Sequence, residues 1–445
     1  MVYDNVLNNP DDFNFQVQQI GPGKHINPIE DEIFVNDDER IAFASQIKNL
    51  RRQFKKDDQI PSFEKAGARK KIFHNPSTTR VGIVTCGGLC PGLNNVIQGL
   101  VNVLEQSYGI EYIFGIRYGY KGLTRHSQHK PIRLTASDVN QIHQQGGTIL
   151  GSSRGNQDPE EMVNELQARN INILFCIGGD GTLKGAQAIA EAANQRNTNI
   201  SIVGVPKTID NDLGFVEKTF GFETSVQVST DIISSAYSEA KGAENGIGIV
   251  KLMGRDSGFI TATASLANSV VDFCLIPEIP FQIEGADNIC TAVEKRLTEK
   301  NHAVIVIAEG AGQDLFNNNQ KRLDASGNIL KDDIGELLKQ GLIKHFDSQK
   351  IPFSIKYLDP SYHIRSVAAN ASDSVFCYLL AEYAVHAGMS GKTNLVIGYW
   401  NNFFTHVPIQ LATRERRTVE LDSALWRGVV SSTQQNQKAR ESRIH

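Results

Sequence analysis

Short apolar runs that alternate with longer amphipathic stretches from Val81 onward constrain the fold of this chain most strongly. Each run is nearly continuous in apolar residues, as expected of strands buried on both faces. The clearest are VGIVTC, NILFCIGG, SIVGV, GIGIVKL, VVDFCLI, HAVIVIAEG and TNLVIGY. Helices are predicted between them over residues 93–105, 183–195, 226–243 and 287–298. The alternation predicts βαβ units around parallel sheets, which is the α/β class of fold.

The length of 445 residues is enough for two main domains. Residues 1–80 are polar, carry the charged cluster KNLRRQFKKDD and have weak apolar periodicity. We expect them to form an N-terminal extension packed on the main body. Residues 413–445 are expected to form a C-terminal helix and a polar tail.

Charge and composition exclude several classes of function. The formal net charge of -4 argues against a nucleic-acid partner, which would need a basic face. No apolar run reaches membrane-spanning length, and the acidic, polar start resembles neither a signal peptide nor a transit peptide. We therefore expect a cytoplasmic protein without a membrane partner.

The six cysteines are expected to be reduced, and four of them lie in apolar stretches. The spacing of Cys86 and Cys90 is compatible with a metal, but no second Cys/His pair follows to complete a tetrahedral site. We therefore predict that these two thiols pack as small apolar side chains, and a zinc site is the less favoured alternative.

Polar motifs follow five of the predicted strands directly. GGLCPGLNN follows the first, GGDGT the second, PKTIDND the third, MGRDSG the fourth, and Glu309 closes the sixth. Ligands in open α/β sheets bind outside the carboxyl ends of the strands. These motifs are therefore the candidate site.

The two glycine motifs indicate phosphate binding. Glycines between a strand and a helix let the backbone approach an anion, and the helix amides can hold a phosphate. In IGGDGTLKG, Asp180 is suited to hold Mg²⁺, and the alternative is that Thr182 simply caps the helix. Kinases of NAD and of lipids share a similar loop, so this motif alone does not name the acceptor.

PKTIDND adds the groups that phosphoryl transfer to an alcohol requires, namely a carboxylate near the hydroxyl and cations near the phosphoryl group. Asp210 fits the general base, with Lys207 and Thr208 on the phosphoryl side. The alternative is an Asx-turn, which would account for Asn211 and is also compatible with Asp212.

Seven motifs in order then resemble the 6-phosphofructokinase family over about residues 81–408. They are GGLCPGLNN, ILGSSRG, GGDGT, PKTIDND, KLMGRDSG, IAEG and KYLDPSYHIRS. The chain is most similar to the long branch, which includes pyrophosphate-dependent enzymes and ATP-dependent enzymes of plants and trypanosomatids. The resemblance implies two Rossmann-like three-layer α/β/α domains with the active site in the cleft between them. The donor domain would span 81–225 with about 390–412, and the fructose 6-phosphate domain 226–389.

The resemblance also implies roles for single residues. Asp210 matches the base that takes the proton from the sugar 1-hydroxyl, and Thr208, Lys207 and Arg255 match groups at the reacting centre. The residues that match the sugar and sugar-phosphate pocket are Thr208, Asp210, Asp212, Met253, Gly254, Arg255, Glu309, Lys356, Tyr362 and Arg365. Cationic groups there suit a dianionic phosphate.

On the donor side, the matching residues are Gly87, Gly88, Arg154, Gly179, Asp180, Gly181 and Thr182. Asp180 matches the magnesium aspartate, so Mg²⁺ and ATP are the implied cofactor and co-substrate. Two positions depart from the short bacterial pattern, because Tyr362 stands where histidine is usual and Gly246 where an arginine reaches a neighbouring subunit. The family implies a homotetramer.

Gly181 and Lys207 indicate different phosphoryl donors. Pyrophosphate users have aspartate at the first position, which would crowd and repel a nucleotide, whereas this chain has glycine. Lys207 is typical of pyrophosphate users, but a retained lysine need not hinder ATP. We therefore predict ATP as the donor, with pyrophosphate as the alternative.

Two rival functions remain at this stage. A lipid or NAD kinase would explain GGDGT but not PKTIDND, MGRDSG or SYHIRS. A non-catalytic sugar-phosphate sensor on the same fold is the stronger rival, because fold does not imply function. The joint presence of Asp180, Thr208, Asp210 and Arg255 argues against it.

Overall fold

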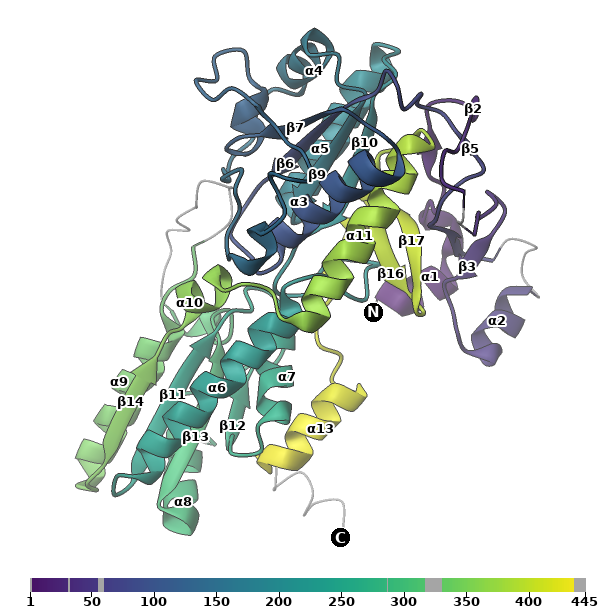
Figure 1. Cartoon of the computed structure of the whole chain (residues 1–445). Helices are drawn as coiled ribbons and strands as arrows, with labels where there is room; N and C mark the ends of the chain where they lie inside the picture. Colours follow the sequence, from purple (N-terminus) through teal and green to yellow (C-terminus); the bar gives the residue numbers. More distant parts are fainter. Residues whose placement is uncertain (1, 31–32, 55–59, 286, 317–329, 436–445) are drawn as a thin grey trace. The chain divides into compact units, whose positions relative to one another are not determined.

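The computed structural model describes residues 2–30, 33–54, 60–285, 287–316 and 330–435 (Figure 1). These residues form two compact units, each described by itself below. Unit 1 takes in the described residues of Met1–Ile209, Leu213–Gly221 and Ser366–Arg416. Unit 2 takes in Asp210–Asp212, Phe222–Arg365 and the described residues from Arg417 onward.

Unit 1 is built on a mixed sheet of nine described strands. Their order is β3 (Arg40–Ala42), β4 (Ser62–Lys65), β17 (Phe403–Pro408), β16 (Leu395–Trp400), β10 (Ser201–Pro206), β9 (Ile173–Gly178), β6 (Arg80–Thr85), β7 (Tyr112–Ile116) and β8 (Ile132–Arg133). The five strands from β16 to β7 are parallel, and the strands outside them pair antiparallel. The motif-bearing strands β10, β9 and β6 therefore lie side by side at the centre.

Helices cover both faces of this sheet because successive strand residues point to opposite sides. Gly204 of β10 faces Leu183 of α5 (Asp180–Gln195), whereas Phe175 of β9 lies against Gly388 of α11 (Ala371–Met389). The face of α5 also carries α4 (Pro159–Ala168), and α3 (Leu93–Asn102) packs beside α11 (Figure 1). The result is the three-layer α/β/α arrangement.

The remaining elements of unit 1 are short. They are α1 (Val2–Asn8), α2 (Ile47–Phe54), α12 (Ile409–Ala412), a π-helical turn at Val103–Ser107, 3-10 turns at Pro10–Asp12, Gly119–Leu123 and Ile142–Gln144, and the two-stranded pairs β1 (Gln18–Gln19) with β15 (Lys392–Thr393) and β2 (His25–Ile26) with β5 (Lys71–Ile72). Across the described residues, no helix combines the length and the apolar character needed to cross a membrane.

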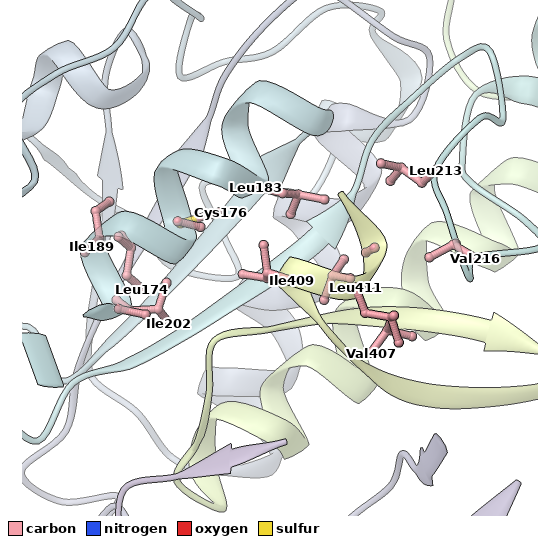
Figure 2. Close-up of a cluster of buried hydrophobic side chains, with 14 of the residues drawn as sticks. Leu174, Cys176, Leu183, Ile189, Ile202, Leu213, Val216, Val407, Ile409 and Leu411 are labelled. Atoms are coloured by element: carbon pink, nitrogen blue, oxygen red, sulfur yellow. The ribbon is translucent and has the colours of Figure 1, made fainter. Parts of the chain in front are cut away.

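A buried apolar cluster joins the sheet of unit 1 to α5. Figure 2 shows Leu174, Cys176 and Ile202 of the sheet beside Leu183 and Ile189 of the helix. Val407, Ile409 and Leu411 belong to the same cluster, as do Leu213 and Val216, which follow the PKTIDND segment in the chain. The core thus supports the segments that carry polar motifs.

The residues before Val81 contribute directly to unit 1. Strand β4 pairs with β17, and β3 continues the sheet beyond β4. Phe15, Phe43 and Phe63 pack their rings on Phe215 and, for the last two, on Trp400. The extension is thus part of the sheet and of its aromatic core.

Unit 2 contains a four-stranded parallel sheet. The order is β12 (Phe273–Leu275), β13 (His302–Ala308), β11 (Gly246–Leu252) and β14 (Ser354–Leu358). Gly246 and Gly248 of β11 lie against the backbone of α6 (Phe222–Lys241), whereas Ile247 and Ile249 share a core with the helices of the other face. Those helices are α8 (Ile289–Lys300) and α9 (Ile334–Gln349) (Figure 1).

The other elements of unit 2 are α7 (Phe259–Ala267), α13 (Ala424–Thr433), a 3-10 turn at Gln313–Leu315 and α10 (Ser361–Ser366), whose last residue belongs to unit 1. Among them, α7 packs beside α6, α13 packs on α7, and the remaining two follow strand ends. The predicted C-terminal helix corresponds to α13, whereas residues 436–445 of the predicted tail lie outside the described residues.

The division into units differs from the predicted domain boundaries. The sequence predicts a second domain over 226–389, whereas α11 belongs to unit 1 because it packs on β10 and α3. The three residues Asp210–Asp212 also depart from the prediction, which placed them in the donor domain, because they group with unit 2. All six cysteines are buried and carry free thiols.

Candidate functional site

The donor-side residues gather where three neighbouring parallel strands end. Gly87 and Gly88 follow β6, Gly179 and Asp180 follow β9, and Lys207 follows β10. The carboxyl ends of parallel strands meet at one edge of a sheet. Unit 1 therefore brings the predicted donor residues together.

Side-chain contacts connect these loops. The Lys207 ammonium donates a hydrogen bond to the Gly88 carbonyl at 2.8 Å. A Cβ atom added to Gly87 would lie 3.5 Å from Lys207 Nζ, and one added to Gly88 would lie 3.3 Å from Arg154 Nη2. Gly87 has a φ of 86°, a left-handed conformation that favours glycine. Two cations thus flank a glycine loop, as a phosphate site requires.

The second glycine loop begins α5. The helix starts at Asp180, and Gly179 occupies its N-cap without a side-chain bond, so the suggested capping role of Thr182 is wrong. The Thr182 carbonyl instead accepts a hydrogen bond from the Tyr120 hydroxyl at 2.7 Å. The first amides of α5 have no intrahelical acceptor and suit a phosphate.

Gly181 faces open space, because a Cβ atom added there meets nothing within 4 Å. A longer side chain at this position would extend into that space. The Asp180 carboxylate, one residue earlier, pairs with Lys184 at 3.1 Å. Glycine at position 181 keeps the start of α5 accessible.

Among the described residues, no group of three or more His, Cys, Asp or Glu side chains is placed to hold a metal ion. Magnesium in phosphoryl-transfer sites takes one or two carboxylates and completes its shell with phosphates and water. Asp180, whose carboxylate pairs with the half-exposed Lys184, fits this requirement.

Thr208 is held through its backbone within unit 1. Its carbonyl accepts a hydrogen bond from the Thr219 hydroxyl at 2.6 Å, and Thr219 is fully buried. This fixes the chain immediately before Asp210. Sequence reasoning missed Thr219, which has no motif signal of its own.

Asp210 lies in a carboxylate-rich environment of unit 2. Burial raises its pKa to about 7, and the nearby charges of Asp212 and Glu309 act in the same direction. Arg365 and a hydrogen bond from the Arg255 backbone partly offset the increase. A carboxylate whose pKa lies near neutrality is suited to accept and release a proton. The structure therefore brings Asp210, Asp212, Glu309, Arg255 and Arg365 together.

The loops after β11 and β13 are tied to each other. The Glu309 amide donates to the Leu252 carbonyl at 2.9 Å, and the Gly310 amide donates to the Gly254 carbonyl at 3.0 Å. Gly254 has a φ of 128°, and an added Cβ would lie 2.6 Å from the Ser257 carbonyl oxygen. Glycine is required there, and it places Met253 and Arg255 beside Glu309.

The predicted sugar-phosphate residues lie on β14 and α10. Lys356 is exposed on the edge strand, and the Tyr362 side chain is 86% exposed. Arg365 Nε lies 3.0 Å from the Met253 sulfur. Within unit 2, the structure brings Arg365 to the Met253 loop, and it places Lys356 and Tyr362 at the surface.

A glutamine supports this region and was missed by sequence reasoning. Gln313 donates to the Glu309 carbonyl at 2.8 Å and to the Asp332 carbonyl at 3.1 Å. Its side-chain oxygen accepts from the Asp332 amide at 3.1 Å. Gln313 thus fixes Glu309 to the segment before α9.

Parallel sheets with glycine loops after their strands, together with a carboxylate of raised pKa, are the features expected of a phosphotransferase. Comparison with known proteins makes the class specific. The family described as Phosphofructokinase matches residues 80–388. The chain belongs to this family.

Individual relatives agree with this membership. The chain is 46% identical to the ATP-dependent 6-phosphofructokinase of Borreliella burgdorferi, over 96% of this chain and 97% of the relative. It is 45% identical to ATP-dependent 6-phosphofructokinase 7 of Arabidopsis thaliana, over 84% and 77% of the two chains. Because plant and trypanosomatid proteins of this name are both among its relatives, the predicted resemblance is confirmed.

The fold is likewise confirmed by solved structures. The pyrophosphate-dependent phosphofructokinase of Marinobacter aquaeolei superposes with a TM-score of 0.65, at 19% identity, over 80% of this chain and 91% of that one. At this identity the similarity establishes the α/β fold alone.

Proposed function

We propose that this protein is an ATP-dependent 6-phosphofructokinase, which transfers the γ-phosphoryl group of ATP to the 1-hydroxyl of fructose 6-phosphate. The products are fructose 1,6-bisphosphate and ADP. The observation that carries the proposal is Asp210, a carboxylate whose pKa is raised to about 7 beside Asp212 and Glu309. The names of close relatives support the same activity.

Asp210 acts as the general base of the transfer. It takes the proton of the sugar 1-hydroxyl as that oxygen forms a bond to the γ-phosphorus, and the bond from this phosphorus to the bridging oxygen breaks to release ADP. Lys207, Thr208 and Arg255 stabilise the charge on the phosphoryl group in transfer. Positioning and electrostatics supply most of the rate in reactions of this kind.

The donor phosphates bind at the glycine loops of unit 1. Gly87, Gly88 and Gly179 let the backbone approach them, and Arg154 supplies charge beside Gly88. Asp180 holds Mg²⁺, which when bound neutralises charge on the donor phosphates. Gly181 and Thr182 offer helix amides.

The sugar binds to residues of unit 2. Glu309, Asp212, Met253 and Gly254 contact the sugar, and Lys356, Tyr362 and Arg365 bind its 6-phosphate. Arginine and lysine suit a dianionic phosphate, and a tyrosine hydroxyl adds a hydrogen bond.

Pyrophosphate is the second candidate donor because Lys207 is retained. The open space at Gly181 favours ATP, since nothing within 4 Å of an added Cβ atom blocks a nucleotide there. We also propose a cytoplasmic homotetramer, on the strength of the family alone.

The direct test of the base is D210N, which removes the basic oxygen and keeps the size of the side chain. We expect turnover with ATP, Mg²⁺ and fructose 6-phosphate to fall by about 10²–10⁴-fold, with binding of fructose 6-phosphate nearly unchanged. D231N, at an exposed position of α6, is the matched control and should retain full turnover. Full turnover in D210N would rule out the base assignment and favour a sugar-phosphate sensor.

A further inference from the structure

Lys251 lies near the carboxyl end of β11 and bridges two aspartates of unit 2. Its ammonium is 3.1 Å from the Asp333 carboxylate and 2.9 Å from that of Asp359, and its side chain is only 12% exposed. The ammonium also lies 5.9 Å from the centre of the Tyr357 ring. None of the predicted roles includes Lys251.

Both carboxylates accept hydrogen bonds from the first residues of a helix. The Asp333 carboxylate accepts hydrogen bonds from the Gly335 and Glu336 amides at the start of α9, at 3.1 and 3.2 Å. The Asp359 carboxylate accepts from the Ser361 amide at 3.2 Å and from its hydroxyl at 2.6 Å, at the start of α10. Lys251 therefore fixes the starts of two helices to one strand.

Each of these attachments leads to predicted sugar-phosphate residues. The helix α10, whose first residue is hydrogen-bonded to Asp359, carries Tyr362 and Arg365. Asp333 follows Asp332, whose backbone is bonded through Gln313 to the Glu309 carbonyl. Two segments that converge on the same substrate are thus joined at one ammonium group.

The neighbouring strand residue strengthens the connection. Tyr357 donates its hydroxyl to Asp333 at 2.7 Å, and Lys356 precedes it on β14. Because side chains alternate along a strand, anchoring Tyr357 on one face of β14 fixes the direction of Lys356 on the other.

Lys251 stays charged in this environment. Burial acts to lower its pKa, but hydrogen bonds with Asp359, Tyr357 and Asp333 more than offset this and raise the pKa above its usual value. The aspartates themselves are 47% and 39% exposed, so water can solvate them when the lysine is removed. Loss of Lys251 should therefore loosen the attachments without unfolding the unit.

We propose that Lys251 is a positioning residue for the 6-phosphate of the sugar substrate, holding α10 and the Glu309 segment in the geometry that Tyr362, Arg365 and Lys356 need. The proposal rests on the proposed function, because it assumes that fructose 6-phosphate binds to these residues. It assigns Lys251 no contact with the reacting atoms.

The test compares K251M and K251R with the wild type in steady-state kinetics. We expect K251M to raise the KM for fructose 6-phosphate about tenfold, while kcat and the KM for ATP stay within about twofold. K251R should restore most of the loss, because a guanidinium group can pair with two carboxylates. D359N, which keeps the capping oxygen and removes one ionic partner, should give a smaller rise in the same constant.

R296M is the matched control, because Arg296 forms another buried ion pair of unit 2, with Asp272 at 2.6 Å. It should lower the midpoint of thermal unfolding and leave the KM for fructose 6-phosphate unchanged. An unchanged KM in K251M and D359N, or equal losses in kcat and in the KM for ATP, would overturn the role of Lys251. A wild type that neither binds nor phosphorylates fructose 6-phosphate would overturn the proposed function as well, and calorimetric titration with this sugar distinguishes the two cases.

Discussion

At the scale of single residues, the candidate chemistry is concentrated in one pair of carboxylates. Asp210 and Asp212 stand two residues apart, and the charge of Asp212 helps to raise the pKa of Asp210. The sequence identified both residues by motif. It could not show that the charge of Glu309, almost a hundred residues later, also raises the pKa of Asp210. That effect depends on the pairing of β13 with β11, which places the end of β13 beside the end of β11.

The pH dependence of catalysis follows from this environment. A base with a pKa of about 7 is protonated below that pH, so kcat/KM for fructose 6-phosphate should fall tenfold per pH unit on the acid side. D212N removes a like charge and should move this acid limb to lower pH by about one unit. Normalised pH–rate profiles of the wild type and D212N check this. An acid limb at the same pH in both proteins would contradict an effect of the Asp212 charge on Asp210.

The open space at Gly181 leads to a separate prediction about the phosphoryl donor. In G181D a carboxylate would occupy the open space at the start of α5 and repel nucleotide phosphates. The KM for ATP should rise at least tenfold, with little change in the KM for fructose 6-phosphate. N194D is the control, because it adds the same charge at an exposed position near the other end of α5, outside the predicted site. Equal effects of both substitutions would contradict a donor role for position 181.

At the scale of elements, the sequence predicted the buried strands well and the extension poorly. The continuous apolar runs predicted β6, β9, β10, β11, β13 and β16, and the ends of each run lie within two residues of the ends of the strand. Strands β3 and β4 have three and four residues in a polar segment, so no periodicity marks them. Strand β4 is held by pairing with β17, more than 300 residues away in the chain, and β3 by pairing with β4.

The aromatic cluster of the extension gives an element-scale prediction. Phe63 of β4 is fully buried, and its ring packs on Phe15, Phe43, Phe215 and Trp400. F63A should lower the free energy of unfolding by about 3–5 kcal/mol, because it leaves a cavity among these rings. F403A, on β17 with a side chain 46% exposed, is the control and should cost much less. Urea denaturation measures both, and similar losses would contradict the role of the cluster.

At the scale of the whole chain, buried ionic groups join segments that are distant in sequence. Glu64 of β4 forms ion pairs with Arg69 at 2.8 Å and Lys392 at 3.1 Å, and a hydrogen bond at 2.9 Å joins it to the buried His406. Burial opposes ionisation of Glu64, but these three partners lower its pKa to about 2. The extension is thereby fixed to two strands of the C-terminal part of unit 1.

This network predicts how stability depends on pH. Because the folded-state pKa of Glu64 lies below its unfolded value of 4.5, its contribution is complete above about pH 4.5 and is lost as the pH falls toward 2. E64Q should therefore be less stable than the wild type at pH 7 by about 3–5 kcal/mol, and the difference should shrink below pH 4.5. E284Q, at an exposed pair with Lys344, should show no such difference. A difference in the free energy of unfolding between the wild type and E64Q that stays constant from pH 7 to pH 3 would contradict this role of Glu64.

The assignment of α11 shows where sequence reasoning ends. Apolar residues lie on every side of this helix, so no amphipathic face indicates which sheet it covers. The sequence placed it with the second domain, whereas it packs in unit 1 against β10 and α3. Motifs at strand ends were predictable because the chemistry restricts their residue types, but the packing of an apolar helix was not.

The most direct test of the account is a coupled assay of the purified protein with fructose 6-phosphate and Mg²⁺, offering ATP and pyrophosphate in separate reactions. We expect formation of fructose 1,6-bisphosphate with ATP and none with pyrophosphate. Turnover with pyrophosphate alone would show that Lys207 outweighs the open position at Gly181 and would contradict the proposed donor. Absence of product with both donors would contradict the proposed kinase activity itself.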